Sequence, residues 1–282
     1  MTCRPLFLRR TPGPLWRAVI SSVLACLASP ALANMDATEV TIGAFRAFVQ
    51  ATGITTAAER AGGGQTYEGG WQQRPGWVWH APYGQPGADD EPVTHVTHAE
   101  AKAYCTWGGG RLPTEDEWRR AAYTEQRDPP PPGWIRGRTY PYPSGEAPTG
   151  AHCLGDCGET APAVAHARTS RGRGHAPVGR TPPGVNGLFD MGGNVWEWAD
   201  AGPGGEQPTL GGSWWYGAGP MHRTHRATKP ADTAGVYIGF RCIRPLGQPP
   251  HGPAQGSGRS LFSTSPDRAE YRVSASSRST ST

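Results

Sequence analysis

Apolar residues recur at helical spacing in three segments, and each of these segments follows a threonine. The first begins after Thr41, where Phe45, Phe48 and Val49 share one helical face and Gly53 is placed to end the helix. A threonine side chain at this position accepts a hydrogen bond from an amide of the first turn that has no partner within the helix. The pattern predicts a short amphipathic helix from about residue 42 to residue 52.

Two further segments carry the complete capping-box signal. Thr97 with Glu100, and Thr114 with Glu117, place a hydroxyl and a carboxylate three residues apart immediately before apolar positions. Each pair satisfies two amides at a helix start. Short helices are therefore predicted to begin near residues 98 and 115.

Elsewhere the pattern is that of short strands and turns. The stretch V-Y-I-G-F at residues 236–240 is strand-like, whereas glycine and proline clusters at 62–64, 129–132, 181–184 and 202–205 break regular structure. The chain of 282 residues contains 40 glycines, 29 prolines and 11 tryptophans. This composition predicts many loops around an aromatic core and a small sheet.

The first 33 residues have the pattern of a signal peptide. Basic residues up to Arg17 precede an apolar run at 18–27 and a small-residue site, A-L-A, at 31–33. The run is too short to cross a bilayer, so no membrane span is expected and the mature chain is predicted to be periplasmic or secreted. A lipoprotein cysteine at Cys26 and a twin-arginine leader are alternatives that fit the surrounding residues less well.

Residues 34–246 are predicted to form the folded domain. From residue 247 to residue 282 the chain is mainly Pro, Gly, Ser, Thr and Arg, which indicates a disordered tail. The net charge is +4, but the arginines are scattered and form no basic stripe interleaved with aromatic residues. Nucleic acid is therefore not an expected partner.

Four cysteines remain after the signal peptide: Cys105, Cys153, Cys157 and Cys242. An even number in an exported chain predicts two disulfides. Zinc is the alternative, but a single C-x3-C pair is weak spacing for a metal site.

Two carboxylates flank a glycine-rich turn in the segment N-G-L-F-D-M-G-G-N-V-W-E-W at residues 186–198. Asp190 and Glu197 could converge with backbone carbonyls on a hard cation such as calcium. The alternative is a turn in which Asp190 caps local amides and the tryptophans fill the core.

The histidines form two pairs at a spacing of three, His95 with His98 and His222 with His225. Imidazole ligates transition metals, yet no carboxylate completes a recognisable triad, so surface histidines are expected. Ser213 lacks a nucleophile-elbow sequence, which disfavours a serine hydrolase.

Three consecutive aromatic residues, Trp214, Trp215 and Tyr216, directly follow the G-G-S segment at 211–213. Consecutive side chains of a strand point to opposite faces, so at least one of these rings is expected to be exposed. An exposed aromatic ring beside glycines often forms the wall of a binding site.

Seven motifs together resemble the sulfatase-modifying-factor, or formylglycine-generating-enzyme, family. They are E-V-T-I-G-A-F at 39–45, A-K-A-Y-C-T-W at 101–107, R-L-P-T-E-D-E-W at 111–118, A-P-V-G at 176–179, the segment 186–198, G-G-S at 211–213 and G-F-R-C at 239–242. The resemblance covers residues 35–244. It implies an α+β fold of the C-type-lectin-like type with little regular secondary structure.

The resemblance also implies particular pairings and ligands. Cys105 and Cys242 occupy the positions of a family disulfide between a helix and the last strand, which leaves Cys153 and Cys157 to pair locally. It further implies a calcium site, with carboxylates from Asp190 and Glu197 and carbonyls from Met191, Gly193 and Val195.

The catalytic cysteines of the family are absent. Its oxidases bind copper through two cysteines after the G-G-S motif, where this chain has Tyr216 and Met221, and Tyr237 replaces an expected asparagine. Neither a phenol nor a thioether supplies a thiolate, so copper and iron are not expected.

The resemblance therefore implies a non-oxidase member, similar to the accessory proteins of nitrite reductase or pyoverdine maturation. Its groove would bind an unknown peptide, protein or small molecule. The groove is expected to be lined by Trp196, Ser213, Trp214, Trp215, Tyr216, Met221, His222 and Arg226.

Two alternatives remain. One is a metal-dependent oxidase acting on a protein or small molecule, with Met221, His222 and His225 as a different metal site. The other is a structural or adhesive module. Family domains also begin with a further strand pair before the E-V-T motif, so a misassigned start is an alternative to the signal peptide.

Overall fold

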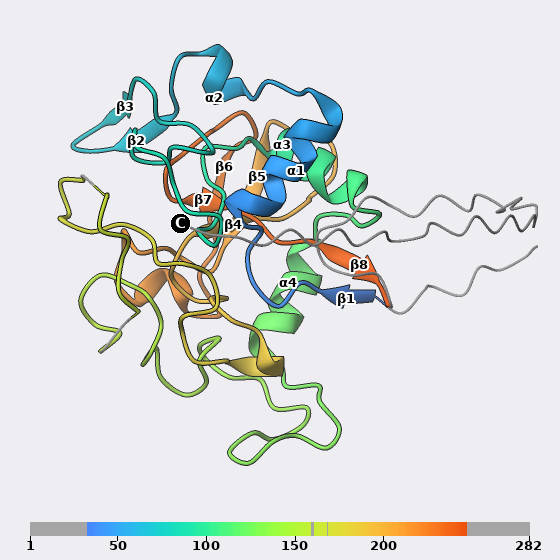
Figure 1. Ribbon diagram of the computed structural model, residues 1–282. Helices are drawn as coiled ribbons and strands as arrows, with labels where there is room; N and C mark the ends of the chain where they lie inside the picture. Colours follow the sequence, from blue (N-terminus) through green and yellow to red (C-terminus); the bar gives the residue numbers. More distant parts are fainter. Residues whose placement is uncertain (1–32, 159–160, 168, 247–282) are drawn as a thin grey trace, which may run out of the picture. The chain divides into compact units, whose positions relative to one another are not determined.

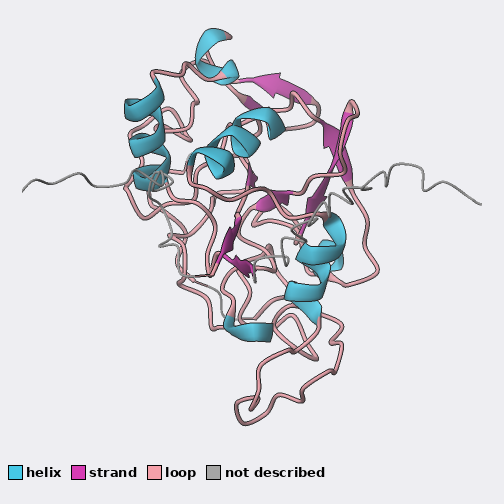
Figure 2. Cartoon of the chain, turned by 90° about the vertical axis from the view of Figure 1, so that its right-hand side faces the viewer, coloured by secondary structure: helices cyan, strands magenta, loops and turns pink. Residues whose placement is uncertain are grey.

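The computed structural model describes residues 33–158, 161–167 and 169–246. The expected signal peptide, except Ala33, and the expected tail from residue 247 lie outside the described residues. The helices are α1 (Ile42–Thr52), α2 (Ala57–Arg60), α3 (His98–Trp107), α4 (Glu115–Tyr123) and the 3-10 turns η1 (Val185–Gly187) and η2 (Gly219–Met221). The strands are β1 (Ala33–Met35), β2 (Gln65–Tyr67), β3 (Trp71–Gln73), β4 (Trp196–Trp198), β5 (Glu206–Leu210), β6 (Thr228–Pro230), β7 (Ile238–Gly239) and β8 (Ile243–Pro245). Loops make up most of the chain between these short elements (Figure 2).

The three helices expected from capping chemistry are present. The Thr41 side chain accepts a hydrogen bond from the Ala44 amide, and Gly53 ends α1 in the left-handed conformation with φ of 68°. Both capping boxes, at the starts of α3 and α4, are complete. Local side-chain chemistry therefore places these helix starts.

The main sheet has four strands in the order β6-β5-β4-β7, with β4 antiparallel to β5 and parallel to β7. The strand-like stretch at 236–240 contributes only Ile238–Gly239 to this sheet. A second sheet is the hairpin β2–β3, which projects at the edge of the molecule in Figure 1. The third pairs β1 with β8 and so joins the two ends of the described chain.

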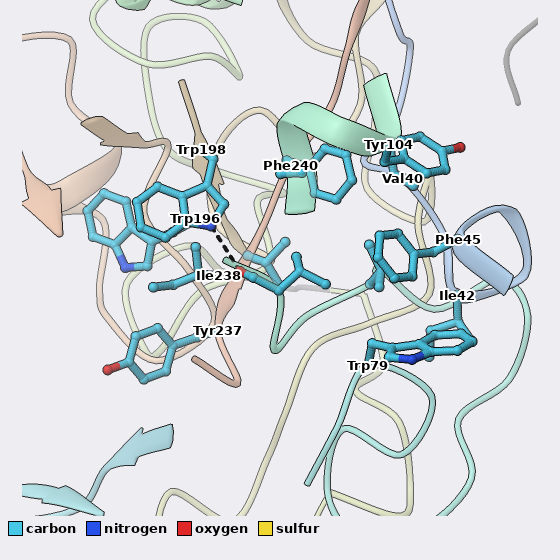
Figure 3. Close-up of a cluster of buried hydrophobic side chains, with 14 of the residues drawn as sticks. Val40, Ile42, Phe45, Trp79, Tyr104, Trp196, Trp198, Tyr237, Ile238 and Phe240 are labelled. Atoms are coloured by element: carbon cyan, nitrogen blue, oxygen red, sulfur yellow. Dashed lines mark hydrogen bonds between the residues drawn. The ribbon is translucent and has the colours of Figure 1, made fainter. Parts of the chain in front are cut away.

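Aromatic rings dominate the core between the helices and the main sheet. Phe45 of α1 stacks on Tyr104 of α3 at a centroid distance of 5.7 Å, and Tyr104 meets Phe240 edge to face at 5.4 Å. Trp196 and Tyr237 lie together at one end of this cluster, and Phe45 and Trp79 lie at the other (Figure 3). The expected aromatic core is confirmed.

Both expected disulfides are present. Cys105 in α3 bonds to Cys242, which directly precedes β8, across 137 residues, and Cys153 bonds to Cys157. Beside the first disulfide, Arg244 of β8 forms a buried ion pair with Asp36 at 2.9 Å, just after β1. These contacts fasten the beginning and end of the domain to α3.

None of the helices in the described part of the chain is both long and apolar enough to cross a membrane.

Candidate functional site

Strand β4 places two tryptophans and a glutamate at the centre of the main sheet. Because side chains alternate along a strand, Trp196 and Trp198 face one side and Glu197 faces the other. The Trp198 indole donates a hydrogen bond to the Val96 carbonyl at 3.1 Å. Its neighbour Trp196 is 3% exposed, and its indole N–H has no acceptor within the described part of the chain.

The Glu197 carboxylate forms a buried ion pair with Arg241 of the G-F-R-C motif. Two guanidinium nitrogens donate to Glu197 at 2.7 and 2.8 Å, and the Trp118 indole donates to the same carboxylate at 2.7 Å. Arg241 also donates to the backbone carbonyls of Asp36 and Phe189. A buried ion pair is stable only when such additional hydrogen bonds are made, and here they are.

Asp190 links its own turn to the loop at residues 179–181. Its carboxylate accepts hydrogen bonds from the Gly179 amide at 2.5 Å and from the Thr181 hydroxyl at 2.6 Å. The turn that follows requires Gly193, since φ is 82° and a Cβ atom there would lie 2.4 Å from the His152 carbonyl oxygen. Asp190 therefore caps an amide, as the alternative to a calcium site expected, although that amide lies 11 residues away in sequence.

Glu39 is the third buried carboxylate, and sequence reasoning did not single it out. One of its oxygens accepts a hydrogen bond from the Asn194 side chain at 3.1 Å, while no described residue donates to the other oxygen. Burial and the nearby negative charge of Asp190 raise the pKa of Glu39, although Arg241 opposes this shift. The signal available in the sequence was its place in the E-V-T motif.

The charges of this cluster bear on the expected calcium ion. Glu39, Asp190 and Glu197 are buried beside a single cation, Arg241, so three ionised carboxylates would leave an excess of negative charge. Carboxylate oxygens are the ligands that calcium prefers, and one Glu39 oxygen is unpartnered within the described chain. The donor types and the charge of this cluster suit calcium, but among the described residues its three carboxylates do not lie close enough together to hold one ion as they stand.

A second buried network joins three loops through Tyr83, His175 and Glu91. The Tyr83 hydroxyl lies 2.9 Å from His175 Nδ1, and His175 Nε2 lies 2.8 Å from Glu91. Burial is the largest influence on Glu91 and opposes its ionisation, but hydrogen bonds from His175 and the Ala88 amide, together with the nearby His175 and His166, lower the pKa of that carboxyl overall. Each of these three side chains is at most 3% exposed, which suits a structural link.

The histidine expectations hold only in part. His95 and His98 are buried, so the prediction of surface positions was wrong for this pair. His95 contacts the Pro82 and Ala234 carbonyls, and burial lowers its pKa to about 4, which keeps the ring neutral. His222 is half-buried and His225 is exposed.

Among the described residues, one group of three potential ligands lies close enough to hold a metal ion: Cys153, Asp156 and Cys157. The two sulfurs are bonded to each other, so they cannot act as thiolate ligands while the disulfide persists. Asp156 instead accepts a hydrogen bond from the Ala218 amide at 2.7 Å.

The residues expected to line the groove separate into two sets. Ser213, Trp214, Trp215 and Met221 are at most 3% exposed and belong to the interior. Tyr216 and His222 are half-buried and Arg226 is exposed, so these residues reach solvent. Tyr216 is thus the ring of the 214–216 triplet that is most exposed.

A chain of ring contacts joins the half-buried Tyr216 and three buried rings to two exposed rings of the β2–β3 hairpin, and we call its members the aromatic wall. They are Tyr67, Trp71, Trp196, Trp215, Tyr216 and Tyr237. Neighbouring rings lie 5.7 to 6.4 Å apart between centroids. Sequence reasoning missed Tyr67 and Trp71, because the loops that bring the hairpin to the site have no readable pattern.

Two cations lie over rings of this wall. The Arg171 guanidinium lies 4.8 Å from the Trp215 ring, and the Lys229 amine lies 5.6 Å from the Trp196 ring. Burial lowers the pKa of Lys229. Each cation therefore lies against a buried ring of the wall, Trp215 or Trp196.

Residues 32–246 match the family model of the sulfatase-modifying factor enzyme 1-like domain. The chain belongs to this family. It is 30% identical over 250 residues to the formylglycine-generating enzyme of Bos taurus, covering 74% of this chain and 64% of that protein. It is 33% identical over 200 residues to the inactive C-alpha-formylglycine-generating enzyme 2 of Mus musculus, covering 64% of this chain and 58% of that one. The chain thus spans less than two thirds of the length of either relative.

The fold comparison agrees with this membership. PvdO from Pseudomonas aeruginosa superposes with a TM-score of 0.51 at 20% identity, over 75% of this chain and 80% of that one. The expected α+β, sulfatase-modifying-factor fold is therefore confirmed.

Proposed function

We propose that this protein is an exported, non-oxidase member of the formylglycine-generating-enzyme family that binds a ligand through its aromatic wall. The observation that carries the proposal is the state of the cysteines: all four in the described chain are bonded in disulfides. A copper-dependent oxidase of this family needs a free thiolate pair, and the positions that correspond to it are Tyr216 and Met221.

The surroundings of Met221 support the same conclusion. Its side chain is fully buried and packs with the Cys153–Cys157 disulfide and Ala218. Its carbonyl accepts a hydrogen bond from Tyr123 at 3.0 Å. These contacts describe a packing role, and a buried thioether is a poor place for an incoming substrate. The name of the mouse relative indicates that this family includes an inactive member.

The test is an aldehyde assay with a sulfatase-type C-x-P-x-R peptide, copper and a reductant. We expect no conversion of the peptide cysteine by the purified full chain, with the bovine formylglycine-generating enzyme as the positive control. Multiple-turnover aldehyde formation by this chain would contradict the proposal. That result would favour the oxidase alternative and a metal site at Met221, His222 and His225.

Calcium belongs to the proposal as a structural ion. Binding would draw Glu39, Asp190 and Glu197 closer together than they lie without the ion, carbonyls from Met191, Gly193 and Val195 would complete the ligand set, and the ion would balance the negative charge. Its role would be to stabilise the native conformation of residues 186–198, a segment that ends with β4 and contributes Trp196 to the aromatic wall.

Export is also part of the proposal, because the chain contains two disulfides. Two disulfides persist in an oxidising compartment, and a periplasmic or secreted protein meets that condition.

A further inference from the structure

The β2–β3 hairpin carries two large aromatic side chains into solvent. Tyr67 and Trp71 are 45% and 48% exposed, are partners in the hairpin register, and meet edge to face at 5.7 Å. Trp71 lies 6.4 Å from Tyr237, so the hairpin contacts the buried part of the wall. Exposed aromatic residues that continue a packed aromatic cluster are typical of a binding surface.

The hydroxyls of this region are unused hydrogen-bond donors. Within the described chain, no group hydrogen-bonds to the hydroxyls of Tyr67, Tyr216 or Tyr237. Burial raises the pKa of Tyr237, whose ring centroid lies 6.3 Å from that of Tyr216 and 6.4 Å from that of Trp71, the hairpin partner of Tyr67. Phenols with high pKa values remain protonated at neutral pH and can donate.

Arg171 has no carboxylate partner among the described residues. Arg46 lies over Trp79 and Arg74 lies over Trp77, and these two arginines pair with Asp89 and Glu68, respectively. Arg171 lies closer to its ring, that of Trp215, yet no carboxylate of the described residues lies within 4.0 Å of it. Tyr216 lies beside Arg171, whose charge opposes the rise in the pKa of this phenol that burial causes.

A cavity of about 370 Å³ adjoins the hairpin and supplies room for a ligand. It is lined by Gln65, Trp71, Pro230, Asp232 and Thr233. Ligand pockets of small molecules begin at about this size. Asp232 would repel an anion, so this side of the site suits the uncharged part of a ligand.

We infer that the surface formed by the hairpin, Arg171 and the tyrosines binds a small aromatic carboxylate. The carboxylate would pair with Arg171 and accept hydrogen bonds from Tyr216 and Tyr237, while the ring would pack against Trp71. The groups without a partner near Trp215 and Tyr216 are donors and a cation, and an anionic acceptor complements them, whereas Asp232 lies in the cavity on the side of the uncharged ring. This inference rests on the proposed function, because it names the ligand class of the same wall.

The experiment compares three probes of one shape by fluorine NMR titration of the full chain. They are 4-fluorobenzoate, 4-fluorobenzyl alcohol and 4-fluorobenzylamine. We expect the carboxylate to bind at least about tenfold more tightly than the amine, with weaker binding at high salt. Arg171→Gln should weaken 4-fluorobenzoate binding by about tenfold. The Arg171→Lys variant retains the charge and should lose less affinity.

Arg46→Gln is the matched control, because it also removes a cation over an indole but lies elsewhere. It should leave 4-fluorobenzoate binding unchanged. Failure of 4-fluorobenzoate to bind, equal affinities for the three probes, or unchanged affinity in Arg171→Gln would each overturn the inference. Aldehyde formation in the peptide assay would instead overturn the non-oxidase proposal, so the two failures are distinguishable.

Discussion

Two regions of this molecule use aromatic and charged residues in opposite ways. Around Glu197 and Arg241, donors and acceptors are matched: the guanidinium donates to one carboxylate and two carbonyls, and the carboxylate also accepts from Trp118. This region is fastened by the Cys105–Cys242 disulfide and the Asp36–Arg244 ion pair. We refer to it as the frame.

The aromatic wall, in contrast, contains donors that have no acceptor in the described chain. They include the Trp196 indole N–H and three tyrosine hydroxyls, with Arg171 lacking a carboxylate nearby. Buried or half-buried polar groups are normally paired, because an unpaired one has a free-energy cost. Apart from one Glu39 oxygen, the frame therefore satisfies its own polar groups, whereas the wall leaves donors without acceptors among the described residues, which is why we propose a ligand there.

The largest expected effect comes from removing the Cys105–Cys242 disulfide of the frame. Replacing Cys105 and Cys242 with Ser should lower the free energy of unfolding by about 5 kcal/mol, since the chain-entropy relation scales with the length of the closed loop. The same relation gives about 2 kcal/mol for replacing Cys153 and Cys157 with Ser, because these residues are only four apart in sequence. Urea unfolding of the two double variants measures both losses, and each serves as the control for the other. Equal losses would show that the long disulfide does not hold the frame together.

The sequence predicted the frame better than the wall, and the reason is physical. Thr41, the Thr97 box and the Thr114 box are local signals that act within one turn, so they could be read directly. Helix α2 has an equally complete box at Thr56 and Glu59, but its four residues were too few to give a periodic pattern.

Contacts between distant segments could not be read in that way. The disulfide pairing came from the family resemblance, and Tyr67, Trp71 and Arg171 reach the wall through loops without periodicity. Of the 214–216 triplet, Tyr216 is the most exposed ring, but the three residues form a turn, so the strand alternation expected from the sequence does not explain its exposure. Glu39 was missed because its partners, Asp190 and Asn194, lie about 150 residues away.

Within the frame, one carboxylate oxygen of Glu39 has no hydrogen-bond partner among the described residues, and calcium should act there. If calcium binds only the native state, a concentration one hundred times its dissociation constant should add about 2.7 kcal/mol to the free energy of unfolding. Chelator should remove this gain. The best probe is Glu39→Gln, which removes a charge but keeps an acceptor for Asn194, whereas Glu197 is needed by Arg241. A free energy of unfolding that is indifferent to both calcium and chelator would contradict the calcium proposal.

Without calcium, the Glu39→Gln substitution should change stability in a pH-dependent way. The raised pKa of Glu39 means that the native state keeps a proton that the unfolded chain releases above a pH of about 4.5. Its stabilising contribution is complete below that pH and is lost as pH rises through the native pKa. Calcium-free Glu39→Gln should therefore be more stable than the parent at pH 7 and similar to it at pH 4. Melting curves at the two pH values measure this difference, and a variant that is less stable than the parent at pH 7 would contradict it.

The smallest expected effect lies in the wall and is the sharpest test of the comparison. Removing the hydroxyl in Tyr216→Phe or Tyr237→Phe should change the free energy of unfolding by less than about 0.5 kcal/mol, because no hydrogen bond within the described chain is lost. Tyr123→Phe is the matched control, since its hydroxyl donates to the Met221 carbonyl at 3.0 Å inside the molecule. Losing that bond leaves a buried carbonyl unpaired and should cost about 1 kcal/mol or more. Urea unfolding distinguishes the two cases. A loss in Tyr216→Phe as large as that in Tyr123→Phe would mean that the hydroxyl already has an internal partner, and the wall would then need no ligand to satisfy it.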